Sequence, residues 1–186
     1  MKIIWLVPAF LVLFGSSLAQ DGECNVISKT DLVDHTAPSF SRYAVSSPSK
    51  GLRPKLDYAS NPIAKAYRSV LREDVSNGPN FAGHHRVTVW GCGSSCAMFA
   101  VTDLNSGKVI TTDIVQSVSS VRLAADDFLP SAATEYWGFR FTKDSALLVV
   151  IGTLNEGESQ QGAFYFTVKD DRLVLIHKTL VKKSCP

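Results

Sequence analysis

The chain has 186 residues, of which 45% are hydrophobic, and its 19 Lys and Arg against 17 Asp and Glu give a net charge of +2. This length is sufficient for one domain with a buried core. The near balance of charge argues against a dedicated nucleic-acid-binding protein, which needs a basic surface to neutralise phosphates.

The first 19 residues have the three parts of a secretory signal peptide. Lys2 precedes an apolar run from Ile3 to Phe14, and small residues at Ser17 and Ala19 fit a cleavage site. The run is shorter than the roughly 18 residues that a membrane-spanning helix needs. Removing 19 of the 186 residues leaves 167, with 18 basic and 17 acidic side chains. We therefore predict export to the periplasm or the extracellular space, with no membrane span after cleavage.

Residues 20–60 are predicted to form a loop-rich arm, because the stretch SSPSKGLRPK contains two prolines and a glycine. Basic residues gather from the middle of this arm onward. The region 42–72 holds one acid, Asp57, and the basic residues Arg42, Lys50, Arg53, Lys55, Lys65, Arg68 and Arg72. These side chains form either a solvated face or a contact surface for an acidic partner, such as a protein or an anionic envelope component.

One helix is predicted near residues 62–75. Asn61 can cap its start, Pro62 suits the first helical position and Gly78 can end it. Apolar side chains recur at helical spacing and should form its buried stripe: Ile63, Tyr67, Val70 and Leu71. Lys65, Arg68 and Arg72 should project mostly from the opposite side.

After Pro79 the pattern changes to short runs of β-branched and aromatic residues, which is typical of strands. The runs are HRVTVW, AMFAVTD, KVITTDIV, SVSSVRL, YWGFRFT, ALLVVIG, GAFYFTV and LVLIHKT. The connections are too short for crossover helices, so the strands should pair in antiparallel fashion. We predict a mainly β (α+β) fold, an antiparallel meander of seven to eight strands with one amphipathic helix packed on it. Residues 61–186 supply the helix and strands, within a single globular domain 20–186.

The four cysteines favour disulfides, since exported proteins fold in an oxidising compartment. Of the three possible pairings we favour Cys92–Cys96 with Cys24–Cys185, because the latter two lie near opposite ends of the exported chain and domain termini often meet. In the chain-entropy model, the long link contributes roughly 5 kcal/mol and the five-residue ring about 2 kcal/mol.

The segment HHRVTVWGCGSSCAMFAV is best explained as a β-hairpin stapled at its tip. Cys92 and Cys96 can face each other across a three-residue loop, and Gly91 and Gly93 give the backbone the freedom that a tight ring requires. Three residues separate the cysteines, whereas dithiol oxidoreductases use two. A rigid tip of this kind, with Ser94 and Ser95 beside Trp90, could dock into a partner at low entropic cost.

A metal site is the other interpretation of this segment. It would use His84 and His85 with a further donor from elsewhere, such as His35, His177 or Asp103. Adjacent histidines on a strand point to opposite faces, which argues against a shared ion. The sequence also lacks a nucleophile elbow and a phosphate-binding loop, so we predict no catalytic residue, no metal and no cofactor.

The segment GPNFAGHHRVTVWGCGSSCAMFAVTDLNSGKV, with the later DSALLVV and GAFYF, resembles a group of uncharacterised exported bacterial proteins. These share an N-F-A-G-H-aromatic segment, W-G-C-G-x-x-C and a D-x-x-x-G-K turn. The resemblance spans about a hundred residues from Asn77 onward and implies an envelope or extracellular setting, but no activity. His85 stands where the group has an aromatic residue, which weakens the case for paired histidine ligands.

Two functions follow from these patterns. The first is an exported non-enzymatic binding protein, such as an inhibitor, immunity factor or envelope accessory protein. It would bind its partner through the tip with Trp90 and through Lys65, Arg68 and Arg72. The alternative is a small exported enzyme or metal-binding protein centred on His84 and His85.

Overall fold

A computed structural model of the chain describes residues 26–32, 34–45, 55–59, 61–119, 122–123, 138–157 and 161–181. The predicted signal peptide 1–19 and the predicted Cys24–Cys185 disulfide lie outside these residues, as do Lys50 and Arg53.

The main element of the fold is one eight-stranded sheet, and every strand pair in it is antiparallel. The main path runs β10-β9-β8-β5-β3-β2, with β4 added on β3 and β7 on β8. The strands are β2 (His85–Gly93), β3 (Cys96–Asp103), β4 (Val109–Ile110), β5 (Val118–Ser119), β7 (Phe139–Arg140), β8 (Leu147–Leu154), β9 (Gln161–Lys169) and β10 (Arg172–Leu180). The predicted antiparallel, mainly β fold is confirmed.

The strand predicted from the run KVITTDIV is much shorter than its sequence pattern. The run KVITTDIV forms only β4, and the chain then loops before β5. Asn155 organises this loop, because its side-chain oxygen accepts from the Gln116 and Ser117 amides at 2.8 and 3.2 Å, and its amide donates to the Ile114 carbonyl at 2.9 Å. The strand preference of the β-branched residues in this run is therefore outweighed by the hydrogen bonds of Asn155, which lies in a distant turn.

The N-terminal arm contains more regular structure than predicted. It holds β1 (Val26–Ile27), the 3-10 helix η1 (Lys29–Leu32) and the 3-10 helix η2 (Phe40–Tyr43). β1 pairs in parallel with β6 (Arg122–Leu123), which is an exception to the antiparallel rule. Ile27 and Leu32 are buried against Leu147, Val149 and Ile151 of β8, so the apolar surface of the sheet orders the arm.

The helical segment is interrupted at Tyr67. It consists of α1 (Pro62–Ala66), α2 (Arg68–Asp74) and the 3-10 turn η3 (Val75–Asn77), where one helix over 62–75 was predicted. The start is as predicted, since the Asn61 side chain accepts from the Ala64 amide at 2.7 Å. Gly78 ends the segment with φ +79°, a conformation that suits glycine. The break coincides with tertiary contacts of the Tyr67 ring, which outweigh local helix preference.

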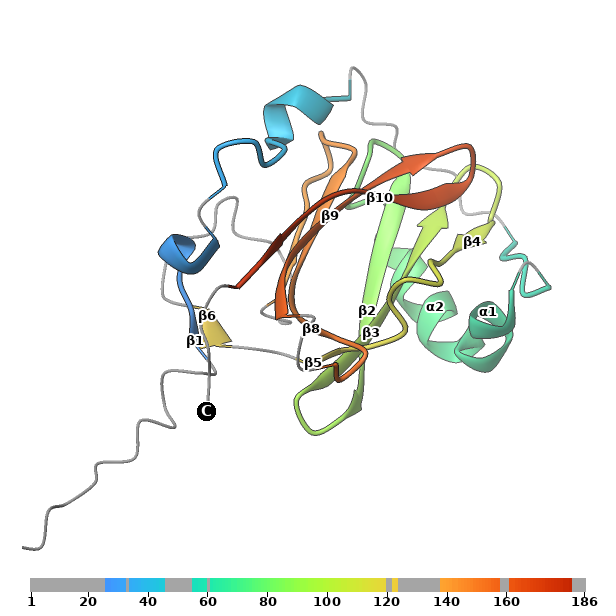
Figure 1. Ribbon diagram of the computed structural model, residues 1–186. Coiled ribbons are helices and arrows are strands. Elements are labelled where there is room, and N and C mark those ends of the chain that lie inside the picture. Colours follow the sequence, from blue (N-terminus) through green and yellow to red (C-terminus); the bar gives the residue numbers. More distant parts are fainter. Residues whose placement is uncertain are drawn as a thin grey trace, which may run out of the picture.

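Three apolar clusters place these elements around the sheet. The largest lies inside the bent sheet, where β8, β9 and β10 face β2 and β3 (Figure 1). The second lies under the arm on the outer side of β8. The third lies between α1, α2 and the outer face of β2 and β3, and includes Leu71, Trp90 and Ala100. The β2–β3 hairpin is thus covered on both faces, except at its ends.

The arm is also attached to β10 by polar contacts. Asp34 lies 2.6 Å from Nε2 of His177 and accepts from the Thr179 hydroxyl at 3.1 Å. Hydrogen bonds from the Thr36 hydroxyl and amide, and then from His177, hold the pKa of the Asp34 carboxyl well below its usual range.

The helix cap should contribute measurably to stability. We expect Asn61→Ala to lower the free energy of unfolding by about 1 kcal/mol, because the Ala64 amide loses its acceptor. Asn61→Asp keeps the acceptor but loses the donor to the Val109 carbonyl, so its free energy of unfolding should lie between those of wild type and Asn61→Ala. Urea unfolding followed by circular dichroism measures both. Equal stability of wild type and Asn61→Ala would contradict this role.

Attachment of the arm through Asp34 should weaken in acid. A depressed folded-state pKa gives stability that is present above the unfolded value of 3.8 and is lost as the pH falls below it. The difference in urea midpoint between wild type and Asp34→Asn should therefore be widest above about pH 5, where the carboxyl is ionised in both the folded and the unfolded chain. The difference should narrow as the pH falls below 3.8. Asp113→Asn, in the exposed loop before β5, is the matched charge control. A constant difference across this range would count against the assignment.

Candidate functional site

The segment NFAGHH forms a tight turn that leads into β2. Ala82 and Gly83 both adopt left-handed backbone conformations, with φ of +45° and +78°. The His85 amide closes the turn on the Phe81 carbonyl at 2.9 Å, and the Gly83 amide donates to the Lys143 carbonyl at 2.7 Å. His84 therefore lies in the turn, and β2 begins at His85.

This turn brings the two histidine rings together. Their centroids are 4.2 Å apart with planes inclined at 37°. The prediction that His84 and His85 point to opposite faces is wrong, because it placed both residues on a strand. The left-handed residues just before His84 rotate its side chain toward that of His85.

Asp103 completes a three-residue cluster with these histidines. It is the ladder partner of His85 across β2 and β3. The ladder hydrogen bond joins the neighbouring residues, since the Leu104 amide donates to the His84 carbonyl at 3.0 Å. His85 and Asp103 are therefore a non-hydrogen-bonded pair, in which the facing side chains are closely spaced. Oδ1 of Asp103 lies 3.5 Å from Nε2 of His84. Asp103 is thus the one further donor, of the three predicted, that meets the histidines.

The other two predicted donors lie elsewhere. His177 contacts Asp34 on β10, and His35 lies in the exposed turn of the arm. The Asp34–His177 contact joins residues 143 positions apart, and no local pattern indicated it.

Burial and hydrogen bonding set the charge of the cluster. His85 is 8% exposed, and burial, followed by the neighbouring His84, lowers the pKa of its imidazole. Burial alone would raise the pKa of Asp103. Hydrogen bonds from the Ser106 hydroxyl at 2.6 Å and the Asn105 amide at 2.8 Å outweigh it, so that this pKa lies below its ordinary value. A neutral imidazole beside a carboxylate can bind a cation.

The opposite end of the hairpin carries the predicted disulfide. Cys92 and Cys96 are bonded, with Cα atoms 5.1 Å apart. The register differs from a simple three-residue loop, because Gly93 pairs with Cys96 while Gly91 pairs with Ala97. Cys92 is the extra residue of a β-bulge, and the turn consists of Ser94 and Ser95. Residues 91–95 are all exposed.

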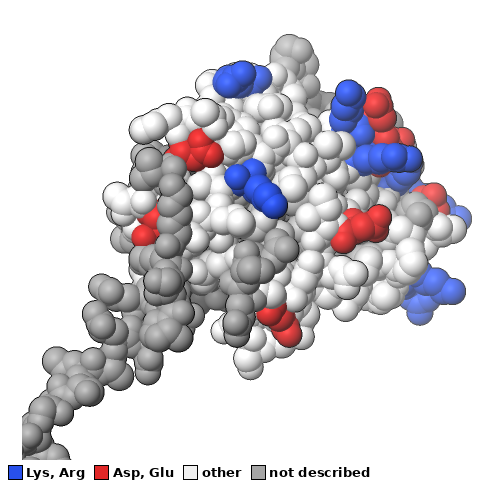
Figure 2. Space-filling view, in the orientation of Figure 1, with Lys and Arg blue, Asp and Glu red and all other residues white. Residues whose placement is uncertain are grey.

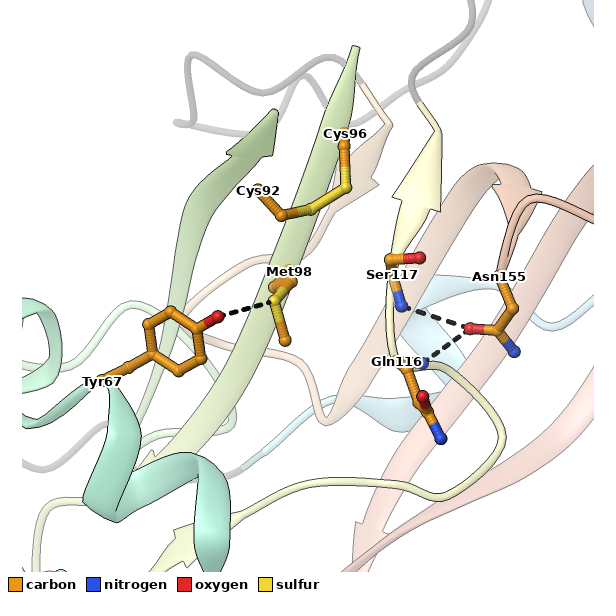
Figure 3. Close-up of a disulfide and its surroundings, with 7 residues drawn as sticks. All are labelled: Tyr67, Cys92, Cys96, Met98, Gln116, Ser117 and Asn155. Atoms are coloured by element: carbon orange, nitrogen blue, oxygen red, sulfur yellow. Dashed lines mark hydrogen bonds between the residues drawn. A yellow bond between two sulfur atoms is a disulfide. The ribbon is translucent and has the colours of Figure 1, made fainter. Parts of the chain in front are cut away.

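Trp90 is not part of this exposed tip. It is 6% exposed and packs against the Tyr67 ring, with centroids 4.8 Å apart and planes inclined at 39°. The predicted role of Trp90 in contacting a partner is therefore wrong, since alternation along β2 directs its ring under the helices. The Tyr67 hydroxyl donates to Sδ of Met98 at 3.4 Å, which places the helices next to the strand that carries Cys96 (Figure 3).

The predicted basic residues of the helices are at the surface. Lys65, Arg68 and Arg72 are all exposed, as are Arg42 and Lys55. Acids accompany them, because Glu73 and Asp74 belong to α2. Figure 2 likewise shows Asp and Glu close to Lys and Arg along the right-hand side of the molecule. The basic surface is therefore local to a few helical side chains.

No protein-family model, curated protein or solved structure matches this chain significantly. Within the residues that the structure describes, none of the helices has the length and apolar character required to cross a membrane.

The disulfide at the tip should have a modest, local effect on stability. We expect Cys92→Ser with Cys96→Ser to lower the free energy of unfolding by about 2 kcal/mol, since the bond closes a ring of five residues. The sheet signal in circular dichroism should be unchanged, because the strands are held by pairing and the core. Urea unfolding gives the value, and a double variant as stable as wild type would contradict it.

Proposed function

We propose that this chain is an exported, non-enzymatic binding protein that docks onto an acidic protein through the tip 91–95 and the basic side chains of α1 and α2. The observation that carries the proposal is the run of five exposed tip residues held by the Cys92–Cys96 disulfide. A disulfide is compatible with the oxidising compartments that exported proteins reach.

Rigidity makes the tip suitable for docking. The disulfide, the bulge at Cys92 and the ladder pair of Gly93 with Cys96 restrict the backbone before any partner arrives. Glycine and serine side chains have few rotamers to lose on binding. A partner would therefore meet the backbone shape and small polar groups at a low entropic cost.

The helices extend this surface. Cys96 and Met98 lie two residues apart on β3 and so point to the same, outer face. Tyr67, between α1 and α2, contacts Met98, as Figure 3 shows. Lys65 and Arg68 flank Tyr67 in the sequence and are exposed. A partner on the tip would thus lie close to these cations, which favours an acidic surface on that partner.

Trp90 supports this surface from beneath. Its ring lies between the hairpin and Tyr67 and is buried in the cluster that holds the helices on the sheet. Its contribution to binding would be the fixed position of α1 and α2, rather than direct contact.

Charge reversal tests the proposal. We expect Lys65→Glu, Arg68→Glu and Arg72→Glu together to weaken binding of the partner at least about tenfold, equivalent to about 1.4 kcal/mol. Ser94→Trp should also reduce binding by obstructing the tip. The partner would be captured by crosslinking in periplasmic or extracellular fractions, purified and titrated by calorimetry at low and high salt.

A matched control separates local contact from net charge. Lys143, Lys169 and Lys178 are exposed and lie outside the tip and the helices, so their reversal changes net charge equally. Binding should survive this change. Two results would contradict the proposal. One is an equal loss of affinity in the helix triple variant and in the control triple variant. The other is an affinity that neither the helix triple variant nor Ser94→Trp changes. Capture of an anionic polymer alone would contradict the choice of a protein partner.

A further inference from the structure

We propose that His84, His85 and Asp103 form a binding site for a divalent transition-metal ion, with Zn²⁺ as the expected occupant. The site lies at the opposite end of the β2–β3 hairpin from the tip. Gly91 lies six positions after His85, which corresponds to roughly 20 Å along a strand. The inference is therefore independent of the proposed partner surface.

The ligand atoms are close enough to share one ion. One potential ligand atom from each residue lies within 4.8 Å of the others, and Nε2 of His84 is 3.5 Å from Oδ1 of Asp103. Zinc bonds to imidazole nitrogen and carboxylate oxygen are each about 2 Å long, so an ion between these two atoms can contact both. For the same ion to reach His85 as well, the ligand atoms must come closer by about an ångström. The partly exposed His84 side chain can make this shift.

Surrounding groups already orient two of the three side chains. Asp103 is fixed through Oδ1 by the Asn105 amide and through Oδ2 by the Ser106 hydroxyl. Nδ1 of His85 lies 3.4 Å from the Ala82 carbonyl. A proton on Nδ1 directed at this carbonyl leaves Nε2 as the metal-binding nitrogen. Outer hydrogen bonds of this type hold the ligands of known metal sites and strengthen binding.

The cluster has one open side. The side chain of His84 is 36% exposed and that of Asp103 13%, so the ion would enter past His84. Phe81 packs edge-on against His85 and is fully buried, which closes the inner side. Nearby, Asp171 in the turn between β9 and β10 lies 3.2 Å from the Lys108 ammonium. The cluster is therefore closed by Phe81 on its inner side and open to solvent at His84.

The donor set selects the class of metal. Two imidazoles and one carboxylate suit Zn²⁺, Cu²⁺ and Ni²⁺, whereas Mg²⁺ and Ca²⁺ prefer all-oxygen sites. Three protein ligands also leave a coordination position for water, as in zinc sites that remain open. The competing explanation is a simple His84–Asp103 ion pair, which would show no saturable affinity for zinc.

Calorimetric titration of the untagged, chelator-treated protein with ZnCl₂ tests the inference. We expect one ion per chain, with His84→Ala and Asp103→Asn each weakening zinc binding at least about tenfold, by analogy with the 10–100-fold effect of outer-shell changes. Ser106→Ala should weaken it to a smaller extent, because it removes one hydrogen bond to Asp103. MgCl₂ and CaCl₂ should give no saturable binding.

The controls keep the result specific. His35→Ala and His177→Ala each remove a histidine elsewhere and should bind zinc as wild type does. Zinc should raise the melting temperature of wild type but not that of His84→Ala, whose folding is checked separately by circular dichroism. No saturable binding to wild type, or equal binding by wild type and His84→Ala, would overturn the metal site. The triple helix variant should bind zinc normally, so failure of one proposal leaves the other testable.

Discussion

The pairing of β2 with β3 is the constraint on which both candidate sites depend. Side chains alternate between the faces of a strand, so Val87 belongs to the inner core whereas Trp90 lies under the helices. A slip of one residue would exchange these faces and separate His85 from Asp103. Asn80 opposes such a slip, because its carboxamide accepts from the Val87 amide at 2.8 Å and donates to the Val87 carbonyl at 3.0 Å.

Arg86 joins this hairpin to the helices. Its Nε and Nη2 donate to the two Asp74 oxygens at 2.8 and 2.7 Å, and Nη1 donates to the Gly78 carbonyl at 2.7 Å. Burial acts to raise the pKa of Asp74, but hydrogen bonding and charge from Arg86 hold it below its ordinary value. A partly buried, bidentate pair of this kind contributes more than an exposed one. It fixes the end of α2 beside β2, and so fixes the surface next to the tip.

Features that depend on chain neighbours could be predicted from the sequence, including the cap at Asn61, the antiparallel strands and the Cys92–Cys96 disulfide. The histidine cluster could not be predicted in this way. Ala82 takes a left-handed conformation that is rare for a residue with a Cβ atom, and it places His84 in the turn, outside the strand in which side chains alternate. The Ala-Gly pair before the histidines was the available signal for a turn. The burial of Trp90 depends on which face the helices cover, which is decided by contacts distant in sequence.

The two candidate sites share one hairpin but should act independently. His85 and Asp103 lie at the end where β2 begins, and the disulfide holds the end where it turns into β3. Between them, each face of the hairpin is packed, against the inner core on one side and the helices on the other. A close-packed element of this kind cannot shift gradually, and a change of register would disrupt both clusters. A ligand at one end therefore cannot change the structure of the other end without disrupting the packing between them. We expect zinc to leave the affinity of the tip for its partner unchanged.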